Sequence, residues 1–136
     1  MKKFVIGALA TLAIAAPLTA FASTSPLIVW QGITTYLPDA FAFDVKSVEN
    51  VQMDLVQYPT DGTSAGTADM VYDIGDYANG YWQEIYGNYT NSDAYVTWSN
   101  VQPSNSHSYN LEVYNKAYWT YGTPGLATDG NGYVYY

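Results

Sequence analysis

Cysteine is absent from the 136-residue sequence, and its absence removes several kinds of chemistry at once. Without cysteine the chain has no disulfide, no thiol nucleophile and no thiolate metal ligand. Many exported domains of this size depend on disulfides, so this one must be stabilised by burial alone. The only histidine, His107, lies in a polar segment between two serines, and we interpret it as a solvated loop residue. A metal site with two histidines is therefore excluded as well.

Long apolar runs are also missing, except for one at the N-terminus that has the features of a signal peptide. Lys2 and Lys3 precede an almost uninterrupted apolar stretch from Phe4 to Ala16, which Pro17 ends. A membrane-spanning helix needs about 20 apolar residues, so this stretch is too short to cross a bilayer. The small-x-small sequence that ends at Ala22 predicts cleavage after that residue.

Cleavage at this point divides the chain into a signal peptide, residues 1–22, and a mature segment, residues 23–136. The mature length suits one domain with a single core. We expect the protein to be secreted or held at the cell surface, or to lie in the periplasm if its host is Gram-negative. We expect no membrane span in the mature segment, because no second apolar run of sufficient length follows.

Positive charge is scarce, since the chain has no arginine and only four lysines. Removal of Lys2 and Lys3 with the leader takes the formal net charge from −8 to −10, because all twelve acidic residues lie in the mature segment. Such a negative surface repels phosphate backbones and anionic lipid headgroups. We therefore expect no nucleic-acid partner.

Aromatic residues are what the sequence has in abundance, with fifteen tyrosines, four tryptophans and four phenylalanines. Each buried aromatic side chain removes about 150–250 Å² from water, and apolar burial contributes about 25 cal/mol per Å². A handful of buried rings therefore outweighs a missing crosslink. We expect most of the rings to lie in the core or on sheet faces.

The spacing of apolar residues predicts strands along the whole mature segment. Alternation is clearest from Phe41, where Phe41, Phe43 and Val45 share one side of a strand and more polar residues share the other. Asn79-Gly80 is typical of a type I′ hairpin turn, which needs positive φ at both central residues. The spacing predicts an all-β protein with seven or eight short strands in an antiparallel sandwich or a small barrel. The segments from which these strands would come lie within 27–37, 41–45, 51–55, 68–74, 80–86, 94–101, 108–114, 117–121 and 132–136, with loops at 59–66, 88–93 and 102–106.

Two stretches resemble bacterial immunoglobulin-like and fibronectin type III-like modules over about residues 41–115. The first is Asp44–Met70, and the second runs from Val101-Gln102-Pro103 to Tyr109-Asn110-Leu111-Glu112-Val113. In those modules a tyrosine opens the strand after a corner, and its hydroxyl bonds back to the preceding loop. The resemblance gives this structural role to Tyr109. It also implies that the fold is an immunoglobulin-like β-sandwich, and that the protein is a binding or spacer module with no catalytic residues.

Tryptophan and tyrosine side chains are the candidate ligand-binding groups. In a strand, successive side chains face opposite sides, so Tyr-Trp pairs place one ring inward and one outward. Outward rings stack on the apolar faces of sugars or anchor a protein interface. They also form cross-strand pairs that only stiffen a sheet. The candidates are Trp82, Trp98, Trp119, Tyr118 and Tyr121.

Paired carboxylates are the alternative basis for a function. Asp73 with Asp76, or Glu84 with an acid on a neighbouring strand, would supply the acid and base of a small glycoside hydrolase. We expect no cofactor, although calcium is possible. Asp129 and Asn131 offer oxygen ligands separated by glycines, but the same residues are typical of a hairpin turn before the last strand.

We therefore expect a secreted, non-enzymatic module that recognises a protein or a glycan. A self-assembling component of a surface layer, fibre or matrix is an alternative, because the chain ends on the aromatic strand residues Tyr133, Tyr135 and Tyr136. The small glycoside hydrolase is the other alternative.

Overall fold

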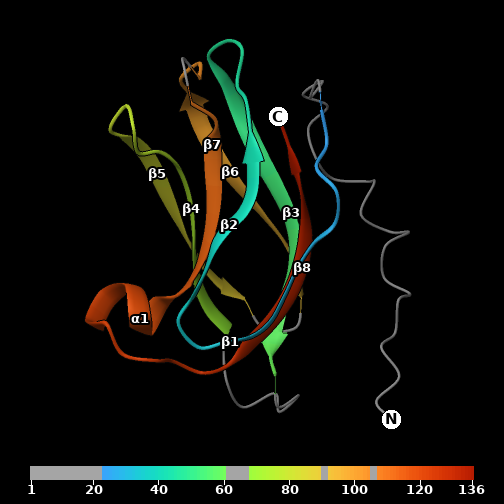
Figure 1. Ribbon diagram of the computed structural model, residues 1–136. Coiled ribbons are helices and arrows are strands. Elements are labelled where there is room, and N and C mark those ends of the chain that lie inside the picture. The colour runs from blue at the N-terminus through green and yellow to red at the C-terminus, as the bar shows by residue number, and fades with distance from the viewer. Residues whose placement is uncertain (1–22, 61–67, 90–91, 105–106) are drawn as a thin grey trace.

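The computed structural model describes residues 23–60, 68–89, 92–104 and 107–136. The predicted signal peptide and most of the predicted loop at 59–66 lie outside these residues. Within them, two four-stranded antiparallel sheets pack face to face, which confirms the predicted sandwich (Figure 1). The elements are β1 (Ile28–Ile33), β2 (Tyr36–Phe43), β3 (Glu49–Pro59), β4 (Ala68–Asp76), β5 (Tyr81–Tyr89), β6 (Ser92–Val101), β7 (Tyr109–Asn115), α1 (Lys116–Tyr121) and β8 (Thr128–Tyr135).

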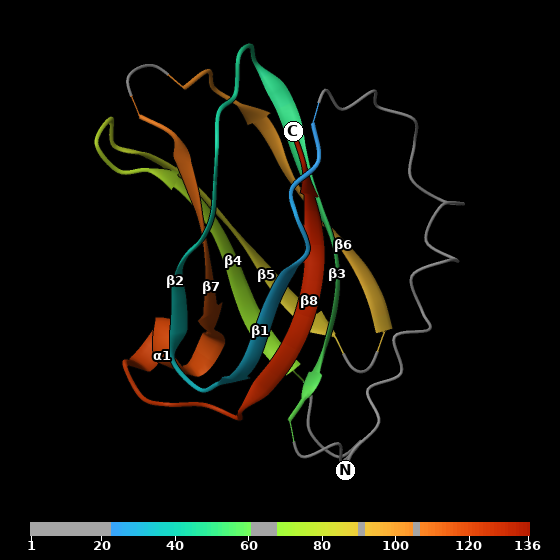
Figure 2. The same ribbon diagram turned by 45° about the vertical axis from the view of Figure 1, so that its right-hand side comes forward.

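The strand order is that of a jelly roll. One sheet has the order β1-β8-β3-β6 and the other β2-β7-β4-β5, so only the β4–β5 hairpin joins neighbours within one sheet (Figure 2). An immunoglobulin sandwich places its first two strands side by side in one sheet. Here β1 and β2 lie in different sheets, so the strand order differs from the one that the resemblance implied.

The core lies between the sheets, and in several strands its side chains alternate with side chains that face outward. In β7, buried and half-buried residues alternate from Tyr109 to Asn115, and β8 has the same pattern. The predicted alternation also holds for Phe43 and Val45, which are buried. Several of the largest side chains in the protein are fully buried: Trp98, Tyr72, Tyr109, Met53, Leu55 and Met70. Burial of these side chains replaces the stabilisation that disulfides supply elsewhere.

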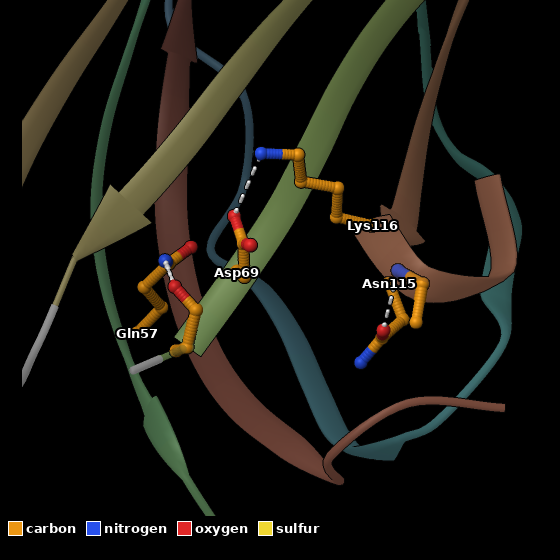
Figure 3. A network of polar contacts seen from close by, with 6 residues as sticks. Gln57, Asp69, Asn115 and Lys116 are labelled. Carbon is orange, nitrogen blue, oxygen red and sulfur yellow. Dashed lines mark hydrogen bonds and ion pairs between the residues drawn. The ribbon is translucent and has the colours of Figure 1, made fainter. Parts of the chain in front are cut away.

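Three polar side chains in the core, those of Gln57, Tyr72 and Trp98, make hydrogen bonds that join the two sheets. The Gln57 Nε2 donates to the Ala68 carbonyl oxygen over 2.7 Å (Figure 3). The Tyr72 hydroxyl donates to Gln57 Oε1. The indole nitrogen of Trp98 donates to the Tyr72 carbonyl oxygen over 3.3 Å. Because burial without partners would be costly, these bonds allow the core to include polar atoms.

Tyr109 makes the contact that the sequence predicted for it. It opens β7, is buried, and donates its hydroxyl to the Gln102 carbonyl oxygen over 2.8 Å. This bond ties the start of β7 to the end of the preceding β6 strand.

The strand predicted at 117–121 is wrong, because these residues form helix α1. The Asn115 side chain accepts a hydrogen bond from the Ala117 amide over 3.1 Å and so caps the first turn. Gly122 ends the helix with φ +70°, and its amide donates to the Tyr118 carbonyl oxygen. A helix of six residues is too short for apolar periodicity to reveal it.

Two turn predictions also differ from the structure. The β4–β5 connection has four residues, 77–80, and Gly80 is its only residue with positive φ. It is therefore not a two-residue type I′ turn. The segment around Asp129 and Asn131 lies inside β8 rather than in a turn. Gly130 is needed there because a Cβ atom would lie 2.3 Å from the Trp30 ring.

Candidate functional site

A row of three carboxylates crosses the outer face of the β2-β7-β4-β5 sheet. Asp73 on β4 pairs directly with Glu84 on β5 and with Glu112 on β7. Directly paired residues of antiparallel strands project to the same face, so the three acidic side chains are neighbours. Like charges in this position repel one another, which is unfavourable unless another group compensates.

Asp73 is the central carboxylate and the most deeply buried, with 1% of its surface exposed. Its Oδ2 accepts a hydrogen bond from the Tyr77 hydroxyl, whereas its Oδ1 is buried and has no hydrogen-bond partner within the described part of the chain. Burial raises the pKa of Asp73 from 3.8 to about 6; the Tyr77 bond opposes this rise, and the charges of Glu112 and Glu84 add to it.

Tyr77 reaches the carboxylates by folding back from the β4–β5 turn over Gly75. A Cβ atom at Gly75 would lie 2.6 Å from Cζ of the Tyr77 ring, so only glycine leaves room for it. The Tyr77 hydroxyl lies 3.4 Å from Glu112 Oε2 and thus contacts two carboxylates. Burial, together with the neighbouring carboxylates, raises the pKa of Tyr77, which keeps this hydroxyl protonated as a donor.

Aromatic rings surround the carboxylates and complete a pocket of about 420 Å³. Trp82 on β5 is 54% exposed, and its partner across the sheet is Gly75, which carries no side chain. Trp119 on α1 packs edge-on against Tyr114 on β7, with ring centroids 4.7 Å apart. We call this site the aromatic–carboxylate pocket; it is lined by Asp73, Tyr77, Trp82, Glu112, Tyr114 and Trp119.

Tyr114 also holds the Glu112 carboxylate in place through a hydrogen bond. Its hydroxyl donates to Glu112 Oε2, and burial followed by this bond raises the pKa of Tyr114. The ring of Tyr36 stacks between Tyr114 and Tyr118, with centroids 5.2 Å and 5.7 Å away. These three rings support one side of the pocket from β2, β7 and α1.

Helix α1 is held at one end of this sheet face by contacts from its first turn. The Lys116 ammonium lies 3.7 Å from Asp69 Oδ1 on β4 (Figure 3). It also lies 5.4 Å from the centroid of the Tyr86 ring on β5. In Figure 1, α1 lies at the lower end of β4 and β5, and the turn that carries Tyr77 lies at their upper end. Trp119 and Tyr77 therefore enter the pocket from opposite ends of the sheet.

The predicted aromatic candidates do not form one group. Trp82 and Trp119 line the same pocket, so one ligand could contact both rings. Trp98 is fully buried in the core and is not available to a ligand. Tyr118 stacks on Tyr36, and Tyr121, 78% exposed at the end of α1, does not line the pocket.

Three residues of the pocket were missing from the sequence prediction. Glu112 and Tyr114 could have been found only from the register between β4 and β7, which the sequence does not give. Tyr77 lies between the strands predicted at 68–74 and 80–86, and only the space above Gly75, which has no side chain, brings its ring into the site.

Of the two candidate carboxylate pairs, the structure brings together only the second. Asp73 and Asp76 do not form a pair, because Asp73 lies in the pocket while Asp76 accepts hydrogen bonds from Asn79 in the turn. Glu84 lies beside Asp73, as the second predicted pairing requires.

Of the two candidate calcium ligands, Asp129 makes hydrogen bonds within the protein. Asp129 Oδ1 accepts hydrogen bonds from the Gly32 amide and the Thr60 hydroxyl, both over 2.7 Å. Asn131 lies two residues further along β8. Among the described residues, no group of three or more histidine, cysteine, aspartate or glutamate side chains is placed to hold a metal ion.

Comparison with known proteins gives no relative from which a function could be transferred. No family model, no curated protein and no solved structure matches the chain. Within the residues that the structure covers, no helix has the length and apolar character that a membrane crossing requires.

Proposed function

We propose that the protein is an exported, non-enzymatic module that binds a glycan in the aromatic–carboxylate pocket. The observation that carries this proposal is that Trp82 and Trp119, which are 37 positions apart in the sequence, lie around the carboxylates of Asp73 and Glu112. Aromatic faces offer stacking surfaces to the apolar faces of a sugar ring. Carboxylate oxygens accept hydrogen bonds from its hydroxyl groups.

The size and shape of the pocket favour a small saccharide unit over a folded protein. A volume of about 420 Å³ falls within the range of small-molecule sites, about 300–1,000 Å³. A stable protein interface instead buries about 800 Å² on each partner and is centred on a broad patch. The jelly-roll architecture is compatible with this proposal, since lectin domains are among its known uses, but the argument rests on the pocket itself.

The predicted export is consistent with the same proposal. The predicted signal peptide would place the mature segment among surface or extracellular glycans, and the cysteine-free core needs no oxidative folding step. Self-association through the aromatic C-terminal strand stays a prediction from sequence.

The test is a pair of aromatic variants on opposite sheets. Trp82→Ala removes a half-exposed ring of the pocket, and Tyr95→Ala removes an exposed ring of β6, on the sheet that does not form the pocket. We expect Trp82→Ala to weaken binding to a positive glycan on an array or in calorimetry by tenfold or more, about 1.4 kcal/mol. We expect Tyr95→Ala to leave affinity within about twofold, about 0.4 kcal/mol. Equal losses in the two variants, or no binding to any glycan, would refute the proposal.

A small glycoside hydrolase is the second candidate, and one observation favours it. A single hydroxyl, that of Tyr77, contacts the carboxylates of Asp73 and Glu112, and the pKa of Asp73 is raised to about 6. A carboxyl with a raised pKa beside a second carboxylate is the arrangement expected of a glycosidase acid and its partner. Release of reducing ends from a bound glycan, with loss of release in Glu112→Gln, would favour this candidate over a binding module.

A further inference from the structure

We infer that the glycan bound in the aromatic–carboxylate pocket carries a free, protonated amine, as an amino sugar does, and that this ammonium binds the unpaired Oδ1 of Asp73. The inference rests on the proposed glycan-binding function and adds the charge of the ligand to it. Three independent features of the pocket lead to it: its uncompensated charge, its buried acceptor and its rings.

The first feature is charge. Glu84, Asp73 and Glu112 form one row across three strands, and the side chains that line the pocket include no lysine, arginine or histidine. Lys116, the nearest cation along the chain, forms an ion pair with Asp69 beyond the pocket. Burying carboxylates without a counter-charge is unfavourable, so a bound cation would gain the interaction that the protein leaves open.

The second feature is the buried acceptor. The Tyr77 hydroxyl satisfies Asp73 Oδ2, and the Tyr114 hydroxyl satisfies Glu112 Oε2. Asp73 Oδ1 has no partner within the described part of the chain, although only 1% of the residue is exposed. An oxygen that is removed from water in this way needs a hydrogen-bond donor, and a charged N–H donor forms the stronger bond.

The third feature is the ring system. Indole is the side chain that attracts cations best over its face, and phenol rings do the same more weakly. Trp82, Trp119, Tyr77 and Tyr114 all line the pocket that contains the acceptor. An ammonium in this position would interact with the rings and the carboxylate together, while the sugar ring to which it is attached would fill the remaining volume.

Other ligands satisfy only some of these features. A neutral sugar hydroxyl donates to Asp73 Oδ1 but leaves the negative charge uncompensated. An N-acetylated amine donates one N–H but carries no charge. A trimethylammonium group carries the charge and suits the rings, but it has no N–H for Asp73. The primary ammonium of a deacetylated hexosamine unit satisfies all three.

The experiment uses oligosaccharides of glucosamine that differ only at the nitrogen. Calorimetry near pH 7 on the purified exported protein would compare the free amine, the N-acetylated form and the N-trimethylated form, at low and at high salt. We expect the free amine to bind at least tenfold more tightly than either derivative, with a preference over the acetylated form that falls as salt rises.

Two charge-matched variants identify the acceptor. Asp73→Asn should reduce the preference for the free amine over the acetylated form to less than threefold. Asp39→Asn removes one negative charge at an exposed position outside the pocket, where φ is 48° and asparagine is well tolerated, and should keep the full preference. Circular dichroism of both variants would check that they are folded.

The possible results distinguish a failure of the amine inference from a failure of the proposed glycan-binding function. If all three forms bind equally and Trp82→Ala weakens each, the glycan function stands and the amine inference is overturned. If the trimethylated form equals the free amine, the assignment of Asp73 as a hydrogen-bond acceptor is wrong. If no form binds and a broad array is also negative, the proposed function fails together with the inference.

Discussion

Substitution of Asp73 by asparagine should stabilise the protein at neutral pH. Asp73 is almost fully buried, and burial raises the pKa of its carboxyl from 3.8 to about 6. Asparagine has the same shape, and its amide oxygen can still accept the Tyr77 hydroxyl bond. The variant therefore removes a buried charge while keeping the packing and the hydrogen bond.

The size of the effect follows from the difference between the two pKa values. A rise of about two units corresponds to about 3 kcal/mol, at 1.36 kcal/mol per unit. Between about pH 4 and about pH 6 the folded chain binds the Asp73 proton more tightly than the unfolded chain does. The free energy of unfolding therefore falls as pH rises through this window and stays reduced above it. Asp73→Asn should match the parent near pH 4 and exceed it by up to about 3 kcal/mol above about pH 7.

Urea unfolding at a series of pH values measures this difference. Asp54 also has a raised pKa because of burial, so the stability of the parent alone would mix two titrations. Subtracting the parent curve from the Asp73→Asn curve isolates Asp73, and Asp39→Asn serves as the control for loss of one charge. The reasoning is refuted if the difference is flat with pH, or if the variant is less stable than the parent above about pH 7.

Two further predictions concern packing and hydrogen bonding in the fold. Tyr109→Phe removes the hydroxyl bond to the Gln102 carbonyl oxygen, and we expect a loss of about 1 kcal/mol, seen as a melting temperature lowered by several degrees; an unchanged melting temperature would show that this bond is not stabilising. Gly130→Ala places a Cβ atom 2.3 Å from the Trp30 ring, and overpacking of this kind costs about 1–3 kcal/mol in denaturant unfolding. An unchanged midpoint for Gly130→Ala would show that Trp30 moves aside freely.

The stabilising effect expected of Asp73→Asn has a functional meaning. Binding sites often contain residues that lower the stability of the folded protein, because those residues are needed to bind the ligand. Asp73, a destabilising residue in a pocket, has this property. Glu84 and Glu112 add to the cost by raising the pKa of Asp73 further. A variant that is more stable and binds less would link the two properties in one side chain.

Strand content could be predicted from sequence because the core requires strict alternation. Phe41, Phe43 and Val45 alternate with exposed residues, and the structure keeps that pattern. Helix α1 was missed because its evidence is local: a capping Asn115 and a terminating Gly122 around six residues of mixed polarity. The beginning of β8 was missed because the segment around Gly130 has the glycine-rich composition of a turn. The glycine is present because the Trp30 ring packs against it.

The candidate site could be predicted only in its parts. Trp82, Asp73 and Glu84 were identified from residue type and strand position, whereas Trp119 was identified from residue type in a segment that forms helix α1. Their assembly depends on register and on sheet order, which place β5, β4 and β7 side by side. Neither property is encoded in a local pattern, so the pocket became visible only in the folded chain.

The indole N–H signals in a proton–nitrogen NMR titration test the central claim most directly. The four tryptophans divide into two at the pocket, Trp82 and Trp119, and two in the core, Trp30 and Trp98. Added glucosamine oligosaccharide should move the signals of Trp82 and Trp119 and leave those of Trp30 and Trp98 in place. Four stationary signals, or shifts confined to the core pair, would contradict the account.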